Sequence, residues 1–182
     1  MKQTDQSLVD AIKVGKRSAY KAAMDRYGPL VLSIAATMVN DRRDVEEILQ
    51  DTFVNVFRSI ALFNPEKSTL ATWIGRIAFN RAVDFLRKQH PEELVDDSQT
   101  LVNTPDLNDS DLDNDTDISL LKEAILTLHA TERTLLSLVY FENMSLSDAA
   151  FILKSNPSAL SARLYRLRHK LSLRINEKRK KL

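Results

Sequence analysis

One segment in the middle of the chain limits what the whole can fold into. Residues 91–117 contain 10 acidic and no basic side chains, are rich in Asp, Asn, Ser and Thr, and include two prolines. Too few apolar side chains are present there to offset the entropy cost of ordering the backbone. We therefore expect a flexible acidic linker at 91–117, with one folded domain at 1–90 and a smaller one at 118–182.

The two flanking segments carry an excess of basic charge. Residues 1–90 hold 14 basic and 10 acidic side chains, and residues 118–182 hold 12 and 5, so that the net charge of +1 hides two basic units. Clustered Lys and Arg bind phosphate backbones. The charge pattern indicates nucleic acid or another polyanion as a partner.

Several classes of protein are excluded or disfavoured by composition. The chain has no cysteine, and its three histidines (His90, His129 and His169) show no metal-ligand spacing. We expect no cofactor, no metal site and no enzymatic activity, since no catalytic constellation is present. No apolar run approaches the roughly 20 residues of a spanning helix, and the N-terminus has no apolar signal core, so we expect a cytoplasmic protein without membrane insertion.

Helical periodicity dominates the first domain, which has all three of the glycines. The pattern predicts an all-α fold, with helices at about 5–14, from 16 or 17 to 27, 29–39, from 41 or 44 to 60, and from 68 or 69 to 89. Asp5 is the expected cap of the first helix, and the Gly28-Pro29 pair is expected to separate the second helix from the third. The third helix is apolar on several sides and should lie in the core.

Two faces of this domain carry polar groups that suggest function. Glu47, Gln50 and Asp51 share an exposed face, where a protein-docking patch and a solvated acidic surface are equally good interpretations. On the fifth helix, Asn80 and Arg87 together with Arg76 can contact DNA or remain solvated. Trp73 and Phe79 can stack on bases or belong to the core, and for Trp73 the spacing favours the core.

The sequence of the second domain predicts helices at about 118–128, 131–141, 146–153 and 157–177. Ser145 with Asp148 forms a capping-box pattern, and Asn156 before Pro157 marks a second helix start. A short helix, a tight turn and a longer helix are the spacing of a helix-turn-helix. The exposed tip of the longer helix would then face DNA bases through Ser158, Ala159, Ser161, Ala162 and Tyr165. The basic residues near phosphates would be Arg163, Arg166, Arg168 and Lys170. DNA binding is favoured over an ordinary hairpin with a solvated basic face.

Specific residue runs carry a resemblance to a known family. The run from Asp44 to Phe53, then Phe63, then Thr72-Trp-Ile-Gly-Arg-Ile-Ala-Phe-Asn80 with Asp84 and Arg87, resembles region two of bacterial RNA polymerase sigma factors. Leu128 with Arg133, followed by Ser145 to Leu171, is similar to their region four. Order, spacing and size resemble the extracytoplasmic-function (ECF) group of the sigma-70 family, which lacks region three.

The resemblance implies a promoter-specificity subunit that binds bacterial core RNA polymerase and promoter DNA. It implies that Glu47, Gln50 and Asp51 dock on the polymerase's largest subunit. It implies that the fifth helix and the loop before it read and open the minus-ten element, through Phe63, Asn64, Lys67, Arg76, Asn80, Asp84 and Arg87. It implies that the second domain binds the minus-thirty-five element through Ser158, Ser161, Ala162, Arg163, Tyr165 and Arg166. It also implies an anti-sigma factor as a regulatory partner.

The start of the predicted recognition helix departs from the family pattern. Where Gly-Thr-Val-Lys-Ser-Arg or a similar run is usual, this chain has Ser158-Ala-Leu-Ser-Ala-Arg163, and His129 stands where a proline is common. Loss of one phosphate-binding lysine should weaken DNA binding modestly and lower its salt slope by about one unit.

Other functions compete with the sigma hypothesis. A free-standing helix-turn-helix regulator would bind duplex DNA alone and would need a dimer interface. An adaptor of the same fold that does not bind DNA would tolerate charge-neutral substitution of Arg163 and Arg166. An enzyme of unknown kind would keep its turnover when every basic surface patch is removed.

Overall fold

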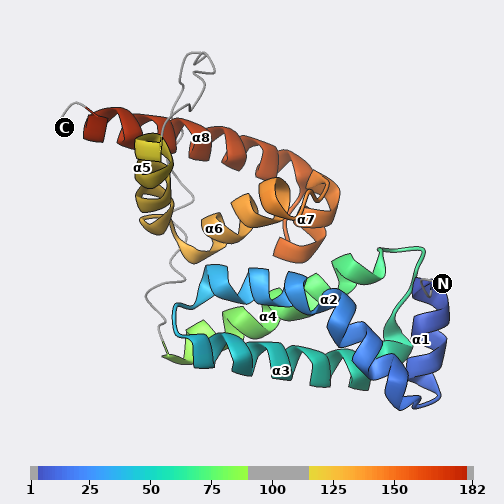
Figure 1. Cartoon of the computed structure of the whole chain (residues 1–182). Helices are drawn as coiled ribbons and strands as arrows, with labels where there is room; N and C mark the ends of the chain where they lie inside the picture. The colour runs from blue at the N-terminus through green and yellow to red at the C-terminus, as the bar shows by residue number, and fades with distance from the viewer. Residues whose placement is uncertain (1–3, 90–114, 180–182) are drawn as a thin grey trace.

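The computed structural model describes residues 4–89 and 115–179, and every regular element in these two ranges is helical. The linker was expected at 91–117, and its residues 91–114 lie outside the described residues. Its last three residues begin helix α5 (Asp115–Leu126), so the second helical unit starts earlier than expected. The helices form an N-terminal unit and a C-terminal unit that lie against one another (Figure 1). Within the described residues, no helix is both long and apolar enough to span a bilayer.

The N-terminal unit is built from α1 (Asp5–Lys13), α2 (Arg17–Met38), α3 (Arg42–Ser59), the short 3-10 turn η1 (Ile60–Leu62) and α4 (Leu70–Gln89). Helices α2, α3 and α4 pack against each other in all three pairs. Their shared core is apolar and fully covered, with Ile34, Met38, Ile48, Leu70, Ile74 and Leu86 among its least exposed side chains. Apolar residues at steps of three and four therefore form the core of the bundle, and the polar residues between them form its outer surface.

The expected break at Gly28-Pro29 is wrong. Helix α2 runs without interruption from Arg17 to Met38, with Pro29 inside it. Proline removes the amide donor to the carbonyl four residues earlier, which costs about 3 kcal/mol in a helix interior. Asp25, whose carbonyl loses that donor, is exposed to water. Burial of α2 on both sides of the proline offsets the cost, with Ala23, Tyr27, Leu30, Val31 and Ile34 in the core.

The start of α1 also differs from the expectation. Thr4, and not Asp5, is the N-cap, and its hydroxyl accepts a hydrogen bond from the amide of Ser7. The Asp5 carboxylate instead accepts a hydrogen bond from the Tyr27 hydroxyl at 2.7 Å and pairs with Arg26 at 2.9 Å. Burial raises the pKa of the Tyr27 hydroxyl above its ordinary value of 10.0, and the Asp5 carboxylate adds to the rise. Asp5 therefore fastens α1 to α2.

The C-terminal unit contains α5 (Asp115–Leu126), α6 (Ala130–Leu136), α7 (Leu146–Leu153) and α8 (Pro157–Arg179). Helix α6 continues into a π-helical turn, η3 (Ser137–Phe141), where a single helix at 131–141 was expected. The longest helix, α8, presents one apolar stripe to the others, with Leu160, Leu164, Leu167, Leu171 and Ile175 all buried.

The predicted helix-turn-helix is present in α7 and α8. The Ser145 hydroxyl accepts from the amide of Asp148 at 3.1 Å, which begins α7 at the predicted residue. Lys154 ends α7 in the left-handed region with φ +55°. Asn156 then caps α8 by accepting from the amide of Ala159 at 2.7 Å. Local signals alone set both helix starts.

Candidate nucleic-acid interface

The first turns of α8 are open to solvent on the side away from the apolar stripe. The residues predicted to face DNA bases are exposed there: Ser158, Ser161, Ala162 and Tyr165. Arg166, one of the two arginines predicted to bind beside them, is also exposed. The buried stripe fixes which face of the helix points outward. A helix about 10–12 Å across with a free N-terminal tip has the shape that the DNA major groove accepts.

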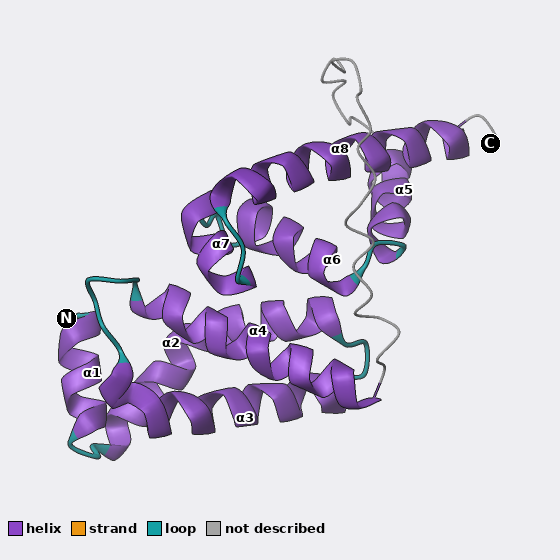
Figure 2. Cartoon of the chain, turned by 180° about the vertical axis from the view of Figure 1, so that it is seen from behind, coloured by secondary structure: helices purple, strands orange, loops and turns teal. Residues whose placement is uncertain are grey.

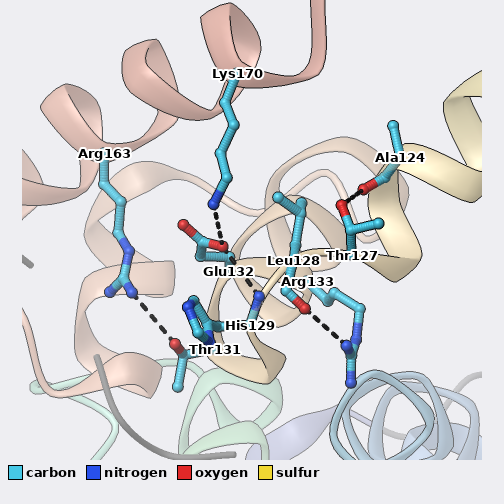
Figure 3. Close-up of polar contacts among 9 residues, drawn as sticks. All are labelled: Ala124, Thr127, Leu128, His129, Thr131, Glu132, Arg133, Arg163 and Lys170. Carbon is cyan, nitrogen blue, oxygen red and sulfur yellow. Dashed lines mark hydrogen bonds and ion pairs between the residues drawn. The ribbon is translucent and has the colours of Figure 1, made fainter. Parts of the chain in front are cut away.

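Three basic side chains of α8 are tied to the rest of the C-terminal unit. Arg163 donates from Nη2 to the Thr131 hydroxyl at 3.2 Å, and the Lys170 ammonium lies 3.4 Å from the Glu132 carboxylate (Figure 3). Arg168 donates from Nε to the Tyr140 hydroxyl at 2.7 Å. Arg163 and Lys170, seven residues apart, lie on one flank of the buried stripe, and Arg168 lies on the other. Each contact restricts a long side chain, which reduces the entropy that the side chain would lose on meeting a phosphate.

Helix α4 carries the row of polar residues predicted to contact the minus-ten element. Asn80 is half-buried, Asp84 pairs with Arg81 at 2.8 Å, and Arg87 is exposed in the last turn. Arg76 begins the row, but its guanidinium points to the C-terminal unit, where Nη1 donates to the carbonyl of Phe151 at 2.8 Å. The structure therefore brings Asn80, Asp84 and Arg87 together on α4 and separates Arg76 from them by a contact of its own.

The loop before α4 is ordered by its own polar groups. The Asn64 side chain accepts from the amide of Glu66 at 2.8 Å, and Lys67 is exposed. Phe63 is only 8% exposed, and its ring lies 5.6 Å from that of Trp73, centroid to centroid. Trp73 packs on the core, as the spacing favoured, and Phe79 is a core residue. Asn64 and Lys67 are the accessible members of the predicted loop site, whereas Phe63 supports the loop from beneath.

Helix α3 lies on the far side of the N-terminal unit from the C-terminal unit (Figures 1 and 2). Glu47, Gln50 and Asp51 are all exposed, whereas Ile48, Thr52 and Phe53 on the other side of the helix are buried. The polar side chains therefore form one continuous surface that no other described element covers.

Sequence reasoning missed the polar groups that join the two units. Ser33 and Thr37, one turn apart on α2, face Ser137 and Thr134 of the C-terminal unit, with hydroxyl oxygens 3.0 and 2.7 Å apart. On α4, Thr72 donates to the Asp148 carboxylate at 2.9 Å. A signal was available, since hydroxyls at steps of four in a helix that is apolar on several sides indicate a second packing partner.

The chain matches known proteins over nearly its whole length. Residues 23–92 match sigma-70 region 2. The ECF RNA polymerase sigma-E factor of Haemophilus influenzae is 29% identical over 182 residues, covering 94% of this chain and 95% of that protein. RNA polymerase sigma factor SigV of Bacillus subtilis is 30% identical over 134 residues, covering 73% and 76%. The chain belongs to the ECF group of the sigma-70 family.

A solved structure supports the same assignment at the level of the fold. A complex of the sigma factor RpoE with the anti-sigma factor NepR from Bartonella quintana contains a chain that is 21% identical, with a TM-score of 0.63 over 86% of this chain and 96% of that one. The helical architecture predicted from sequence is thus that of a sigma factor. The chain functions as an alternative sigma factor, and the comparisons do not favour the free-standing regulator.

Proposed function

We propose that this sigma factor binds bacterial core RNA polymerase in the cytoplasm, directs it to a restricted set of promoters and helps to open them, without catalysing a reaction itself. One observation carries the proposal. A helix-turn-helix with an exposed tip occurs in the same chain as a helical unit that matches sigma-70 region 2. Region 2 accounts for binding to polymerase, and the helix-turn-helix accounts for binding to duplex DNA upstream.

Polymerase docking is assigned to the acidic face of α3. Glu47, Gln50 and Asp51 are exposed around a buried row, so substitutions there change surface charge without disturbing the core. Exposed carboxylates favour a basic partner surface by steering and by charge pairing. Reversal of one charge at Asp51 should therefore weaken polymerase binding while leaving the fold intact.

Minus-ten recognition is assigned to α4 and to the loop before it. Arg87 supplies charge for backbone contacts, and Arg76 does so once its guanidinium leaves the Phe151 carbonyl. Asn64 and Asn80 supply amides that can donate to and accept from bases. Phe63 is buried, so its assignment is to the support of the loop that receives an unpaired base. Stabilising one extruded base offsets a few kcal/mol of unstacking, which aids opening of the duplex.

Minus-thirty-five recognition is assigned to the start of α8. Ser158, Ser161 and Ala162 are small and exposed, which lets the helix approach base edges closely. Tyr165 adds an aromatic contact. Arg163 and Arg166 lie beside this tip and supply phosphate contacts that position the helix on the duplex.

An anti-sigma factor is proposed as the regulator. The similar chain of Bartonella quintana is seen in complex with an anti-sigma factor. A protein that covers the exposed face of α3 would block polymerase docking directly.

Purified variants test these assignments together with polymerase. Wild-type protein should confer transcription on core polymerase at mapped promoters. Asp51→Lys should lower affinity for core, whereas Asp10→Lys, an exposed charge reversal on α1, should not. Asn80→Ala should bind core normally and form fewer open complexes. Equal core affinity for Asp51→Lys and wild type, or an unchanged yield of open complexes for Asn80→Ala, would contradict the corresponding assignment.

A further inference from the structure

The turn that joins α1 to α2 concentrates positive charge. Residues 11–24 contain no acidic side chain and four basic ones: Lys13, Lys16, Arg17 and Lys21. All four are exposed. Lys21 pairs with Asp25 at 2.7 Å, whereas no described residue forms an ion pair with the other three. Three cationic groups of this turn are therefore available to an anion from outside the chain.

The backbone of the turn is held in one conformation. Gly15 adopts φ +74°, which glycine accepts at no steric cost. The amide of Lys16 donates to the carbonyl of Ala11 at 3.0 Å, which closes the end of α1. The ring of Tyr20 packs edge-on against Phe57 of α3, with 4.6 Å between the centroids. Because the backbone is already ordered, binding of an anion costs the turn little conformational entropy.

The basic residues at the start of α2 do not serve the fold. Lys16 is the N-cap and makes no capping hydrogen bond through its side chain, Arg17 begins the helix, and the first turn has no acidic residue. Cations at this end lower the stability of a helix, because its dipole is positive there. At the start of α3, by contrast, Asp41 caps the helix and Arg42 pairs with Glu46 at 2.9 Å. The uncompensated charge before α2 therefore indicates a role in binding.

The turn adjoins the surface assigned to the minus-ten element. Helix α1 packs against η1, and the loop that begins at Phe63 follows η1 directly. The turn and this loop lie at one end of the N-terminal unit, and α4 ends at the other (Figures 1 and 2). The exposed Lys67 adds a cation within the loop. The turn thus continues the proposed DNA surface beyond the loop, on the side away from Arg87.

The order of the elements along the DNA follows from the proposed assignments. The row on α4 runs from the loop toward Gln89, after which the chain continues to the unit assigned to the minus-thirty-five element. Strands separate from the minus-ten element toward the start site, so the single strand continues past the loop that receives an unpaired base. The basic turn lies on that side, and proteins bind single strands with positive surfaces that follow the phosphate backbone.

We propose that Lys13, Lys16 and Arg17 bind phosphates of the separated DNA strand between the minus-ten element and the start site. This inference rests on the proposed function, since it extends the DNA surface of the same unit. The contacts stabilise the open promoter without selecting its sequence, because they reach phosphates and not bases. Each phosphate neutralised on a single strand adds about 0.7 to the salt slope of binding.

A matched pair of double variants tests the proposal. Lys16→Gln with Arg17→Gln removes two charges from the turn. Arg42→Gln with Arg43→Gln removes two exposed charges from the start of α3. The 22 residues of α2 separate the two positions by about 33 Å, so the second variant controls for a general effect of charge.

Each protein, bound to core polymerase, is titrated with two forked DNA templates. In the short fork, the strand with the captured base ends at the minus-ten element, and in the long fork it continues to the start site. Fluorescence anisotropy at about 50 and 200 mM salt gives the gain in affinity that the extension provides. The gain of the turn variant should have a salt slope smaller by about 1.4, so wild type should lose about sevenfold more of its gain between the two salt concentrations.

The control variant should keep the gain and the salt slope of wild type. The thermal midpoint of the turn variant should not fall, because the substitutions remove cations from the positive end of α2.

The other results separate the failures. Equal gains and salt slopes for wild type and the turn variant would overturn the proposal, and so would an equal loss in the control variant. If the turn variant keeps the gain but loses binding to vesicles that contain phosphatidylglycerol, the turn binds lipid phosphates and not DNA. If wild type with core polymerase binds neither fork, the proposed function itself fails.

Discussion

Gly75→Ala should weaken the contact between α4 and α7 while strengthening the helix that carries the substitution. The added methyl group would lie 2.9 Å from Cδ1 and 3.4 Å from Cγ1 of Ile152 on α7, but 3.5 Å from Cδ1 of Ile34 within its own unit. The last distance is ordinary van der Waals contact. The strain therefore falls on the contact between units and not on the N-terminal core.

The magnitude follows from two opposing terms. Overpacking a well-packed contact costs about 1–3 kcal/mol, and Ile152 is fully buried, so it cannot swing into solvent to relieve the strain. Alanine is favoured over glycine in a helix interior by about 0.8–1 kcal/mol, but this gain is the same whether or not α7 contacts α4. The contact between the two units should therefore weaken by the overpacking term alone, which lowers its equilibrium constant by about 5- to 150-fold.

The assay uses a Ser33→Cys, Ser137→Cys double variant, which places one thiol on α2 and one on η3, where the native hydroxyl oxygens are 3.0 Å apart. Its disulfide, equilibrated against a glutathione buffer, should shift toward the reduced form when Gly75→Ala is added, by up to the factor above. Gly28→Ala is the matched control, because it makes the same helix substitution in α2 and its Cβ meets nothing within 4 Å. An equal disulfide equilibrium for Gly75→Ala, Gly28→Ala and the parent would refute the reasoning from close packing.

Three further results are expected. Asn156→Ala should lower the free energy of unfolding by about 1 kcal/mol in urea titrations, because it removes the cap of α8, and an unchanged midpoint would count against that cap. Raising the pH above 10.0 should destabilise wild-type protein, because folding raises the pKa of the Tyr27 hydroxyl and so favours its neutral form. Tyr27→Phe should lack this part of the loss of stability at alkaline pH. Identical pH profiles of stability for the variant and wild type would exclude the contact with Asp5. Replacement of Arg163 and Arg166 by uncharged residues should reduce the salt slope of DNA binding by about two units, measured by titration at several salt concentrations. An unchanged slope would show that neither arginine contacts a phosphate.

Local sequence signals were sufficient where a helix begins with a polar cap. Ser145 and Asn156 each satisfy an amide that the helix itself cannot, so α7 and α8 begin where the sequence predicted. The exposed tip of α8 followed from the same reasoning, since the leucine stripe fixes the opposite face. In the first domain, the spacing of apolar residues likewise placed Glu47, Gln50 and Asp51 on an exposed surface.

Local signals failed where packing between distant elements decides the outcome. Gly28-Pro29 predicts an interruption from local preference, but burial of α2 along its length outweighs the missing hydrogen bond. The packing of the Phe63 ring against Trp73 was likewise not predicted by local spacing, because the two residues lie on either side of the loop before α4. The hydrogen bond from Arg76 to the Phe151 carbonyl of α7 was not predictable, because the sequence alone did not specify how the two units lie against each other.

Transcription by purified bacterial core polymerase, with and without this protein, tests the central claim most directly. The templates should be genomic fragments that include the region upstream of its own gene. Specific transcripts that appear only when the protein is present, with mapped starts that share two upstream elements, are the expected result. No transcripts from any fragment and no binding to core would contradict the assignment as a sigma factor.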